Sequence, residues 1–156
     1  MKEATDPANC WQTPLEILAA LGPFDLDPCA NDQAPTRCAV EGFTAADDGL
    51  SQPWEGRVFC NPPYGRHSRK WLERCAQHGM ATALVTPKSI GAAWFQAVLR
   101  GSTVLFLRGR LPFIEPTTGR PAAANTQWSM LIAWGDIDRV LLQQSGIPGL
   151  CVEVPA

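Results

Sequence analysis

The sequence predicts an α/β domain with a mostly parallel central sheet flanked by helices, and three observations support this fold class. Short apolar segments of strand length alternate with amphipathic segments of helix length along most of the chain. Such alternation is typical of strand–helix–strand units, whose strands pair in parallel. The chain has 156 residues, of which 46% are hydrophobic and 18% are charged. These values fit one domain with a substantial core, so we expect a single domain over residues 1–156.

The first half of the chain has few regular elements. Residues 1–10 are polar, and we expect them to be loose. Thr13-Pro14 predicts the start of a helix, with threonine as its cap and proline at its first position, and this helix ends at Gly22-Pro23. Short strands are expected at 24–27, 38–40 and 43–45. Because the stretch from Ala30 to Phe43 is too short for a full strand–helix–strand unit, we expect the fold to be abbreviated here.

The second half of the chain is more regular. Apolar runs predict strands at 57–60, 82–86, 103–107, 129–134 and 150–154, the last of them at a sheet edge. Amphipathic patterns predict helices at 67–78, 89–99 and 137–143. Residues 111–128 are rich in Pro, Thr, Gly and Ala and form a long irregular excursion. Because long loops on a rigid scaffold commonly carry recognition, we expect this excursion to face the substrate.

Composition excludes several classes of protein. The net charge is −2 and the pI is about 5.6, so the chain is not a globally basic nucleic-acid binder. The apolar runs are too short to span a bilayer, and the N-terminus lacks the apolar core of a signal peptide. We therefore expect a cytoplasmic protein with no membrane partner. The six cysteines include no CxxC pair, so we expect neither a metal site nor a disulfide framework.

Three unusual stretches fall at the ends of predicted strands. They are Asp27-Pro28, Asp47-Asp48 and Asn61-Pro62-Pro63-Tyr64. In parallel sheets, ligands bind outside the carboxyl ends of the strands. We therefore expect the three stretches to share one rim of the sheet.

The stretch Asn61-Pro62-Pro63-Tyr64 is the most distinctive of the three. Each proline fixes its φ angle at about −65°. The Asn61 side-chain oxygen and the Pro62 carbonyl are therefore two acceptors in a rigid segment of backbone. Two adjacent acceptors suit a planar amino group such as adenine N6, and preorganised dipoles of this kind lower a barrier by about 3–4 kcal/mol. Tyr64 offers a ring on which a base can stack. A plain proline turn with a surface tyrosine is the alternative interpretation of these four residues alone.

Several ordered motifs resemble the phage-type DNA N6-adenine methyltransferases of the Dam family. They are Trp11–Pro14, Phe24–Ala30, Asp48–Leu50, Trp54–Gly65 and Gly109–Phe113. The resemblance spans roughly residues 11–134 and implies a Rossmann-like methyltransferase fold with S-adenosylmethionine as cofactor. It also implies a DNA partner, either a duplex with a flipped adenine or a single strand, in a bacterial or phage-infected cell.

The resemblance also implies roles for individual residues. The catalytic group comprises Asn61, Pro62, Pro63 and Tyr64, and the cofactor-binding group comprises Trp11, Thr13, Pro14, Asp27, Pro28, Ala30, Asp48 and Asn61. Asp27 would face the methionyl ammonium, and Asp48 would face the adenine amino group of the cofactor, with Asp47 as the adjacent alternative. Glu41 is the candidate for the ribose hydroxyls. Where the wider superfamily has a glycine-rich loop, this chain has Cys29-Ala30-Asn31.

Basic residues near two strand ends are candidates for contacts with DNA phosphates. They are Arg66, His67, Lys70, Arg108 and Arg110. A solvated helix face explains the first three equally well. No separate target-recognition domain fits in 156 residues.

Two alternative functions stay open at this stage. The same motif can hold the amino group of an RNA adenine or of a protein glutamine. A catalytically idle nucleic-acid-binding remnant is the second alternative, although a mere binder needs no paired acceptors.

Overall fold

The structure is a computed structural model that describes residues 12–34, 36–115, 118–121 and 127–156. Its helices are α1 (Leu15–Leu21), α2 (Ser68–His78), α3 (Ala93–Leu99) and α4 (Asp136–Gln144), with short 3-10 helices η2 (Ala45–Asp47) and η3 (Pro87–Ser89). Its strands are β1 (Leu26–Asp27), β2 (Glu41–Gly42), β3 (Val58–Cys60), β4 (Ala81–Val85), β5 (Thr103–Leu107), β6 (Met130–Trp134) and β7 (Gly149–Glu153).

The strands form one seven-stranded sheet in the order β2-β1-β3-β4-β6-β5-β7. The pairs β1–β2, β1–β3 and β3–β4 are parallel, whereas β6 is antiparallel to both β4 and β5, and β7 is antiparallel to β5. Strands β1 to β5 therefore share one direction, and β6 and β7 run the opposite way. The fold is a mixed α/β domain: parallel pairing holds for the half that contains β1 to β4, and the other half pairs antiparallel.

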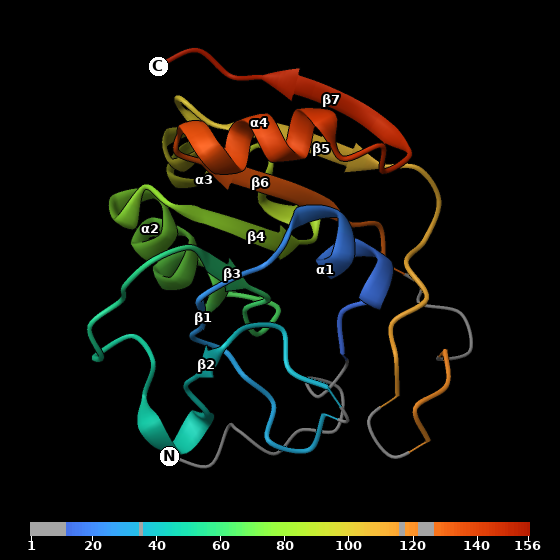
Figure 1. The fold of residues 1–156 in the computed structure, drawn as a ribbon. Coiled ribbons are helices and arrows are strands. Elements are labelled where there is room, and N and C mark those ends of the chain that lie inside the picture. The colour runs from blue at the N-terminus through green and yellow to red at the C-terminus, as the bar shows by residue number, and fades with distance from the viewer. Residues whose placement is uncertain (1–11, 35, 116–117, 122–126) are drawn as a thin grey trace.

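Helices cover both faces of the sheet, and α4 crosses in front of β5 and β6 (Figure 1). The core is correspondingly divided into two clusters. Val58 and Cys60 of β3 pack with α2 and α3 on one face, while Phe59 packs with α1 and α4 on the other. Successive side chains of a strand point to opposite faces, so a strand covered on both sides is apolar at every position. This burial explains why β4, β5 and β6 are predicted by nearly continuous apolar runs.

Four local predictions were wrong. The helix α1 begins at Leu15 after Pro14, without a side-chain cap from Thr13. The α3 helix begins at Ala93 rather than Ser89, because Pro87–Ser89 forms η3. The strands expected at 38–40 and 43–45 are replaced by β2 and by η2, respectively. The η2 turn is stabilised by a capping box, in which the Asp47 carboxylate accepts from the Thr44 amide at 2.7 Å and its hydroxyl at 2.9 Å.

Two negative findings apply to the described ranges. No helix in them is long and apolar enough to cross a membrane. The cysteines that they contain, Cys29, Cys38, Cys60, Cys75 and Cys151, are free thiols.

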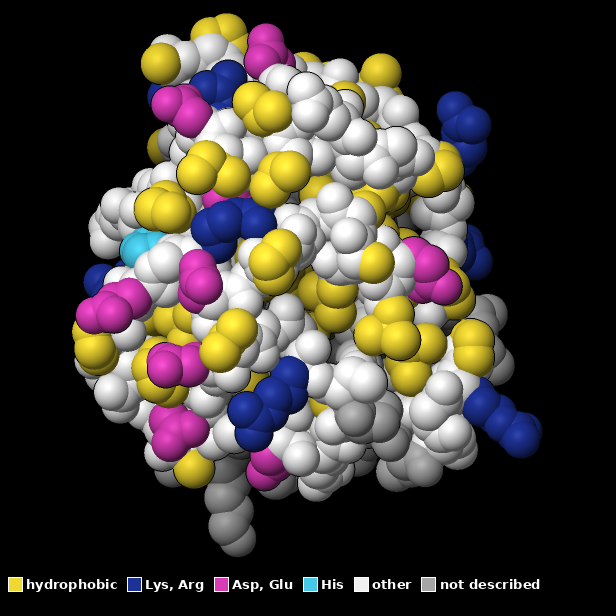
Figure 2. Space-filling view, in the orientation of Figure 1, with side chains coloured by type: hydrophobic (Ala, Val, Ile, Leu, Met, Phe, Trp, Pro, Cys, Tyr) yellow, Lys and Arg dark blue, Asp and Glu magenta, His cyan; other side chains and the backbone are white. Residues whose placement is uncertain are grey.

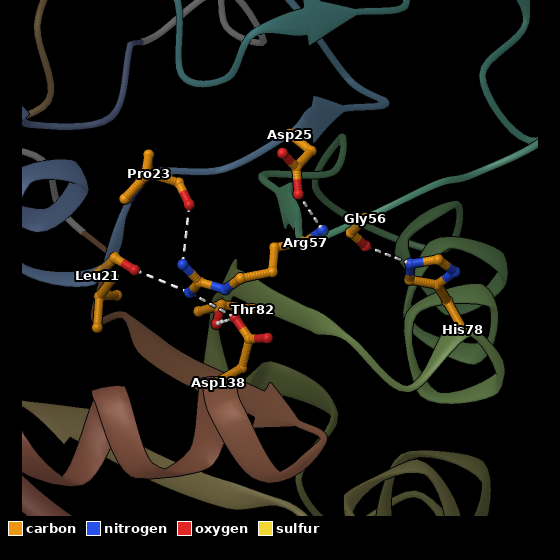
Figure 3. Close-up of polar contacts among 8 residues, drawn as sticks. All are labelled: Leu21, Pro23, Asp25, Gly56, Arg57, His78, Thr82 and Asp138. Atoms are coloured by element: carbon orange, nitrogen blue, oxygen red, sulfur yellow. Dashed lines mark hydrogen bonds and ion pairs between the residues drawn. The ribbon is translucent and has the colours of Figure 1, made fainter.

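A buried ion pair ties four elements of the fold together (Figure 3). Arg57, directly before β3, donates from Nη2 to Asp138 Oδ1 of α4 at 2.8 Å and to the Leu21 carbonyl of α1 at 2.8 Å. Its Nη1 donates to the Pro23 carbonyl at 2.8 Å. The Thr82 hydroxyl of β4 donates to the same Asp138 oxygen at 3.2 Å. The Asp138 side chain is 0% exposed and that of Arg57 only 12%, so this charge pair is almost wholly removed from water.

Replacing Arg57 with alanine is expected to lower the free energy of unfolding by about 3–5 kcal/mol, because it leaves the Asp138 charge buried and uncompensated. Urea denaturation of Arg57→Ala measures this loss. The matched control is Arg139→Ala in the same helix, which removes a longer pair of 3.6 Å between the half-buried Arg139 and the exposed Glu153. That variant should lose less than about 1 kcal/mol. Equal losses in the two variants would contradict the role assigned to the buried pair.

Candidate functional site

A cavity of about 290 Å³ lies at the carboxyl ends of the parallel strands. Its walls come from the segment before α1, the residues that follow β1, the start of β2 and the residues that follow β3. β1 lies between β2 and β3 in the sheet, so the chain leaves β1 towards one side and returns to β3 on the other. Such a switch point is where open α/β sheets bind ligands.

Asp27, the last residue of β1, supplies a buried carboxylate to this cavity. It is 7% exposed, and its Oδ1 accepts from the Cys29 amide at 3.0 Å. Burial raises the pKa of Asp27 to about 6, and the Cys29 hydrogen bond offsets only part of that rise. A carboxylate kept dry at a cavity wall is stabilised by a cationic ligand, because an opposite charge favours the ionised form.

Asn61 follows β3 and opens the stretch Asn61–Tyr64, which we name the spur. Its Nδ2 donates to the Thr13 hydroxyl at 3.4 Å, so the amide nitrogen faces the segment before α1 and the amide oxygen is directed away from it. Pro62 is buried, whereas Asn61 and Tyr64 are half-buried. Burial raises the pKa of Tyr64 to about 12. The phenol therefore stays neutral at physiological pH, and Tyr64 offers a ring without a charge.

The spur also borders a second, smaller cavity of about 50 Å³. Pro62 and Tyr64 line both cavities. The remaining walls of the smaller one come from the first half of α2, from the segment after β4, which includes Thr86 and Lys88, and from Phe95 of α3. The spur thus stands between two cavities, and the larger one is lined by the buried carboxylate of Asp27.

The structure brings some of the predicted cofactor residues together and leaves others apart. Thr13, Asp27, Ala30, Glu41 and Asn61 all line the larger cavity. The other predicted residues are not among its lining residues, or cannot be placed: Pro14 and Pro28 are buried beside it, Asp48 is exposed in a left-handed conformation with φ 53°, and Trp11 lies outside the described residues.

The third stretch of the expected rim, Asp47-Asp48, does not line the cavity itself; the nearby Thr44 does. The Asp47 carboxylate is engaged by Thr44, whose backbone and side-chain hydrogen bonds lower the pKa of Asp47. The assignment of Asp48 to the cofactor stays a prediction.

The predicted DNA-contacting residues are all exposed, in two groups. Arg66, His67 and Lys70 surround the start of α2 directly after the spur, and Arg108 and Arg110 follow β5. On the face that Figure 2 shows, the basic side chains are interspersed with acidic ones rather than gathered into one patch. This distribution agrees with the mildly acidic composition.

Sequence reasoning missed Gln12, which is 4% exposed and lines the larger cavity. Its backbone exchanges two hydrogen bonds of 2.9 Å with Ile114, and its Nε2 donates to the Thr36 hydroxyl. Its Oε1 is buried and has no hydrogen-bond partner among the described residues. An unsatisfied buried acceptor beside a cavity suits a ligand that donates an N–H or O–H. The only signal in the sequence was its position between Trp11 and Thr13.

A cavity at the switch point of an α/β sheet is typical of enzymes that bind nucleotide-like ligands. Residues 2–145 match the family model described as DNA N-6-adenine-methyltransferase (Dam). This match covers most of the chain, so the chain belongs to the Dam family, as its ordered motifs indicated. Membership implies methylation of adenine in DNA with S-adenosylmethionine. No curated protein and no solved structure matches the chain significantly.

Replacing Asp27 with asparagine is expected to raise the free energy of unfolding at pH 8 by about 1–3 kcal/mol, because it removes a charge that burial penalises. The asparagine oxygen can still accept from the Cys29 amide. The folded-state pKa of about 6 lies above the ordinary 3.8, so between these values the folded protein holds more protons than the unfolded chain. As the pH rises from about 4 to about 6, the wild type should therefore lose stability relative to the variant. Above this window the difference in the free energy of unfolding should be constant.

Urea denaturation of both proteins at several pH values from 4 to 8 measures this difference. Asp32→Asn, an exposed carboxylate on the same cavity, is the control and should change stability by less than about 0.5 kcal/mol. Parallel stability curves for Asp27→Asn and the wild type would show that the Asp27 charge is not penalised.

Proposed function

We propose that this protein methylates N6 of adenine in DNA on a flipped base, within a Rossmann-like methyltransferase fold, and that the spur activates the amino group. The observation that carries the proposal is that Asn61 and Pro62 lie against the cavity that contains the buried carboxylate of Asp27. This places two fixed acceptors beside a site suited to a cationic cofactor. When bound, S-adenosylmethionine would supply an electrophilic methyl group.

The acceptor groups around the larger cavity support binding of this cofactor, which carries an ammonium, hydroxyl groups and an amino group. Asp27 binds the methionyl ammonium, which favours the ionised carboxylate against its burial. The unsatisfied Gln12 Oε1 accepts from an N–H or O–H of the same ligand. Glu41, at the start of β2, faces the ribose hydroxyls. The proposed cofactor site also includes the remaining predicted residues, which are Trp11, Thr13, Pro14, Pro28, Ala30 and Asp48.

The spur acts on the amino group of the target base. Asn61 Oδ1 and the Pro62 carbonyl accept its two hydrogens, which opposes delocalisation of the nitrogen lone pair into the ring. Pro63 holds the geometry, and Tyr64 stacks on the base. Since the phenol stays protonated, Tyr64 contributes its ring rather than a negative charge.

Contacts with the DNA backbone come from the two exposed basic groups. Arg66, His67 and Lys70 lie beside the spur, and Arg108 and Arg110 lie at the end of another strand of the same direction. With a small footprint and a net charge of −2, DNA affinity is modest. Because it depends on these phosphate contacts, it falls steeply with salt.

A transfer assay tests the proposed function. The protein is incubated with labelled S-adenosylmethionine and with unmethylated DNA, RNA or a release-factor protein, and the modified residue is identified after digestion. We expect N6-methyladenine in DNA. Asn61→Ala should lower the rate by about 10²–10³-fold, because it removes one preorganised acceptor.

The matched pair for this assay is Tyr64→Phe and Tyr64→Ala. The first keeps the ring and should retain most activity, whereas the second should lose it. If label were found only in RNA or only in protein glutamine, that molecule rather than DNA adenine would be the substrate. Cofactor binding without transfer to any substrate would favour the idle-remnant alternative.

Calorimetric titration of S-adenosylmethionine tests the predicted cofactor residues separately. Glu41→Gln and Asp48→Asn should each weaken binding by about 1–3 kcal/mol if their carboxylates accept hydrogen bonds from the cofactor. Asp47→Asn is the control for the second variant, since the Asp47 carboxylate is already engaged by Thr44. Cofactor affinity that is unchanged in Asp48→Asn would remove Asp48 from the site.

A further inference from the structure

Trp128 differs from the other tryptophans that the structure describes. Its side chain is 55% exposed, whereas Trp54 and Trp134 are buried at 7% and 4%. The remaining described tryptophans, Trp71 and Trp94, are half-buried. Exposing a ring of this size to water is unfavourable, so the position invites a functional explanation.

The ladder of β6 places Trp128 on the rim that carries the spur. Met130 pairs with Val85, the last residue of β4, and the Leu107 amide at the end of β5 donates to the Ser129 carbonyl at 3.2 Å. Trp128 therefore lies just past the carboxyl ends of β4 and β5. The segment that follows β4 at this rim includes Thr86 and Lys88, which line the smaller cavity beside the spur.

Arg110 holds the exposed ring from one side. Its guanidinium carbon lies 5.0 Å from the centroid of the Trp128 ring, which is the geometry of a cation–π contact. Arg110 is itself exposed, as is Arg108. Arg110 thus supports the ring, and Arg108 is a second cation nearby in the chain. A ring beside two cations suits a nucleic-acid base that is attached to phosphates.

Trp128 lines neither cavity, so a base placed against the spur does not rest on it. We propose that Trp128, supported by Arg110, is a stacking platform for a base that flanks the target adenine in the DNA strand. The proposal rests on the proposed function. When a base leaves the duplex, its neighbours lose a stacking partner, and an aromatic ring beside the flipped position replaces part of that loss.

Binding of a fluorescently labelled, unmethylated DNA duplex to Trp128→Ala tests the platform. We expect the affinity to fall by about 5- to 150-fold, the range for loss of one base–aromatic stack. The slope of log affinity against log salt should equal that of the wild type, because tryptophan neutralises no phosphate. Trp128→Phe should recover most of the affinity, and S-adenosylmethionine affinity should be unchanged in both variants.

Ile137→Ala is the matched control. Ile137 is also 55% exposed, but it lies in the first turn of α4, which follows the carboxyl end of β6 at the opposite rim. Its removal should leave DNA affinity unchanged. A DNA affinity in Trp128→Ala equal to that of the wild type would overturn the proposal. So would a loss that comes with a shallower salt slope, or a loss equalled in Ile137→Ala.

The outcome for the platform is separable from that for the proposed function. Methyl transfer by the wild type to RNA or to protein glutamine instead of DNA would overturn the proposed function, whatever Trp128 does. Methylation of DNA adenine by the wild type, together with wild-type DNA affinity in Trp128→Ala, would overturn the platform alone.

Discussion

The position of the candidate site depends on the buried ion pair between Arg57 and Asp138. Arg57 stands at one end of β3 and the spur at the other, separated only by Val58–Cys60. The same guanidinium binds the Leu21 carbonyl at the end of α1, the helix that follows Gln12 and Thr13. Two walls of the larger cavity are therefore fixed to one buried cation. Because Asp138 is fully buried, this anchor lies in the core rather than on the surface around the cavity.

The cavity is lined by two polar groups whose burial is unfavourable. Asp27 is kept in a dry position that raises its pKa, and Gln12 carries a buried oxygen without a partner among the described residues. Both costs are offset when a ligand brings a cation and a hydrogen-bond donor. Buried polar groups without full hydrogen bonding, gathered around one cavity, are typical of binding sites. Proteins commonly give up some folding stability at such sites in exchange for function.

Much of this organisation followed from the sequence, and the failures share a physical cause. The strands β4, β5 and β6 were found because burial on both faces makes them continuously apolar. The two-residue β2 was misplaced, since only its register with β1 defines it. The antiparallel direction of β6 leaves no trace in composition. Asn61 is predicted from the chemistry of its motif, and Asp27 from its place at a strand end and from the family resemblance. The cavity position of Gln12 becomes visible only when the chain folds against Thr36 and Ile114.

The reversed direction of β6 has a consequence for how this fold can diversify. Because β5 and β6 run in opposite directions, the connection between them leaves and re-enters the sheet at the rim of the spur. Its two ends, Arg108 and Trp128, lie beyond the limits of β5 and β6. Chain inserted after Ile114, whose backbone pairs with Gln12 of the cavity wall, would add surface at this rim without altering the register of β5 or β6. The fold can in this way gain surface at the rim of the cavity by lengthening one connection, while the strands of the sheet keep their pairing.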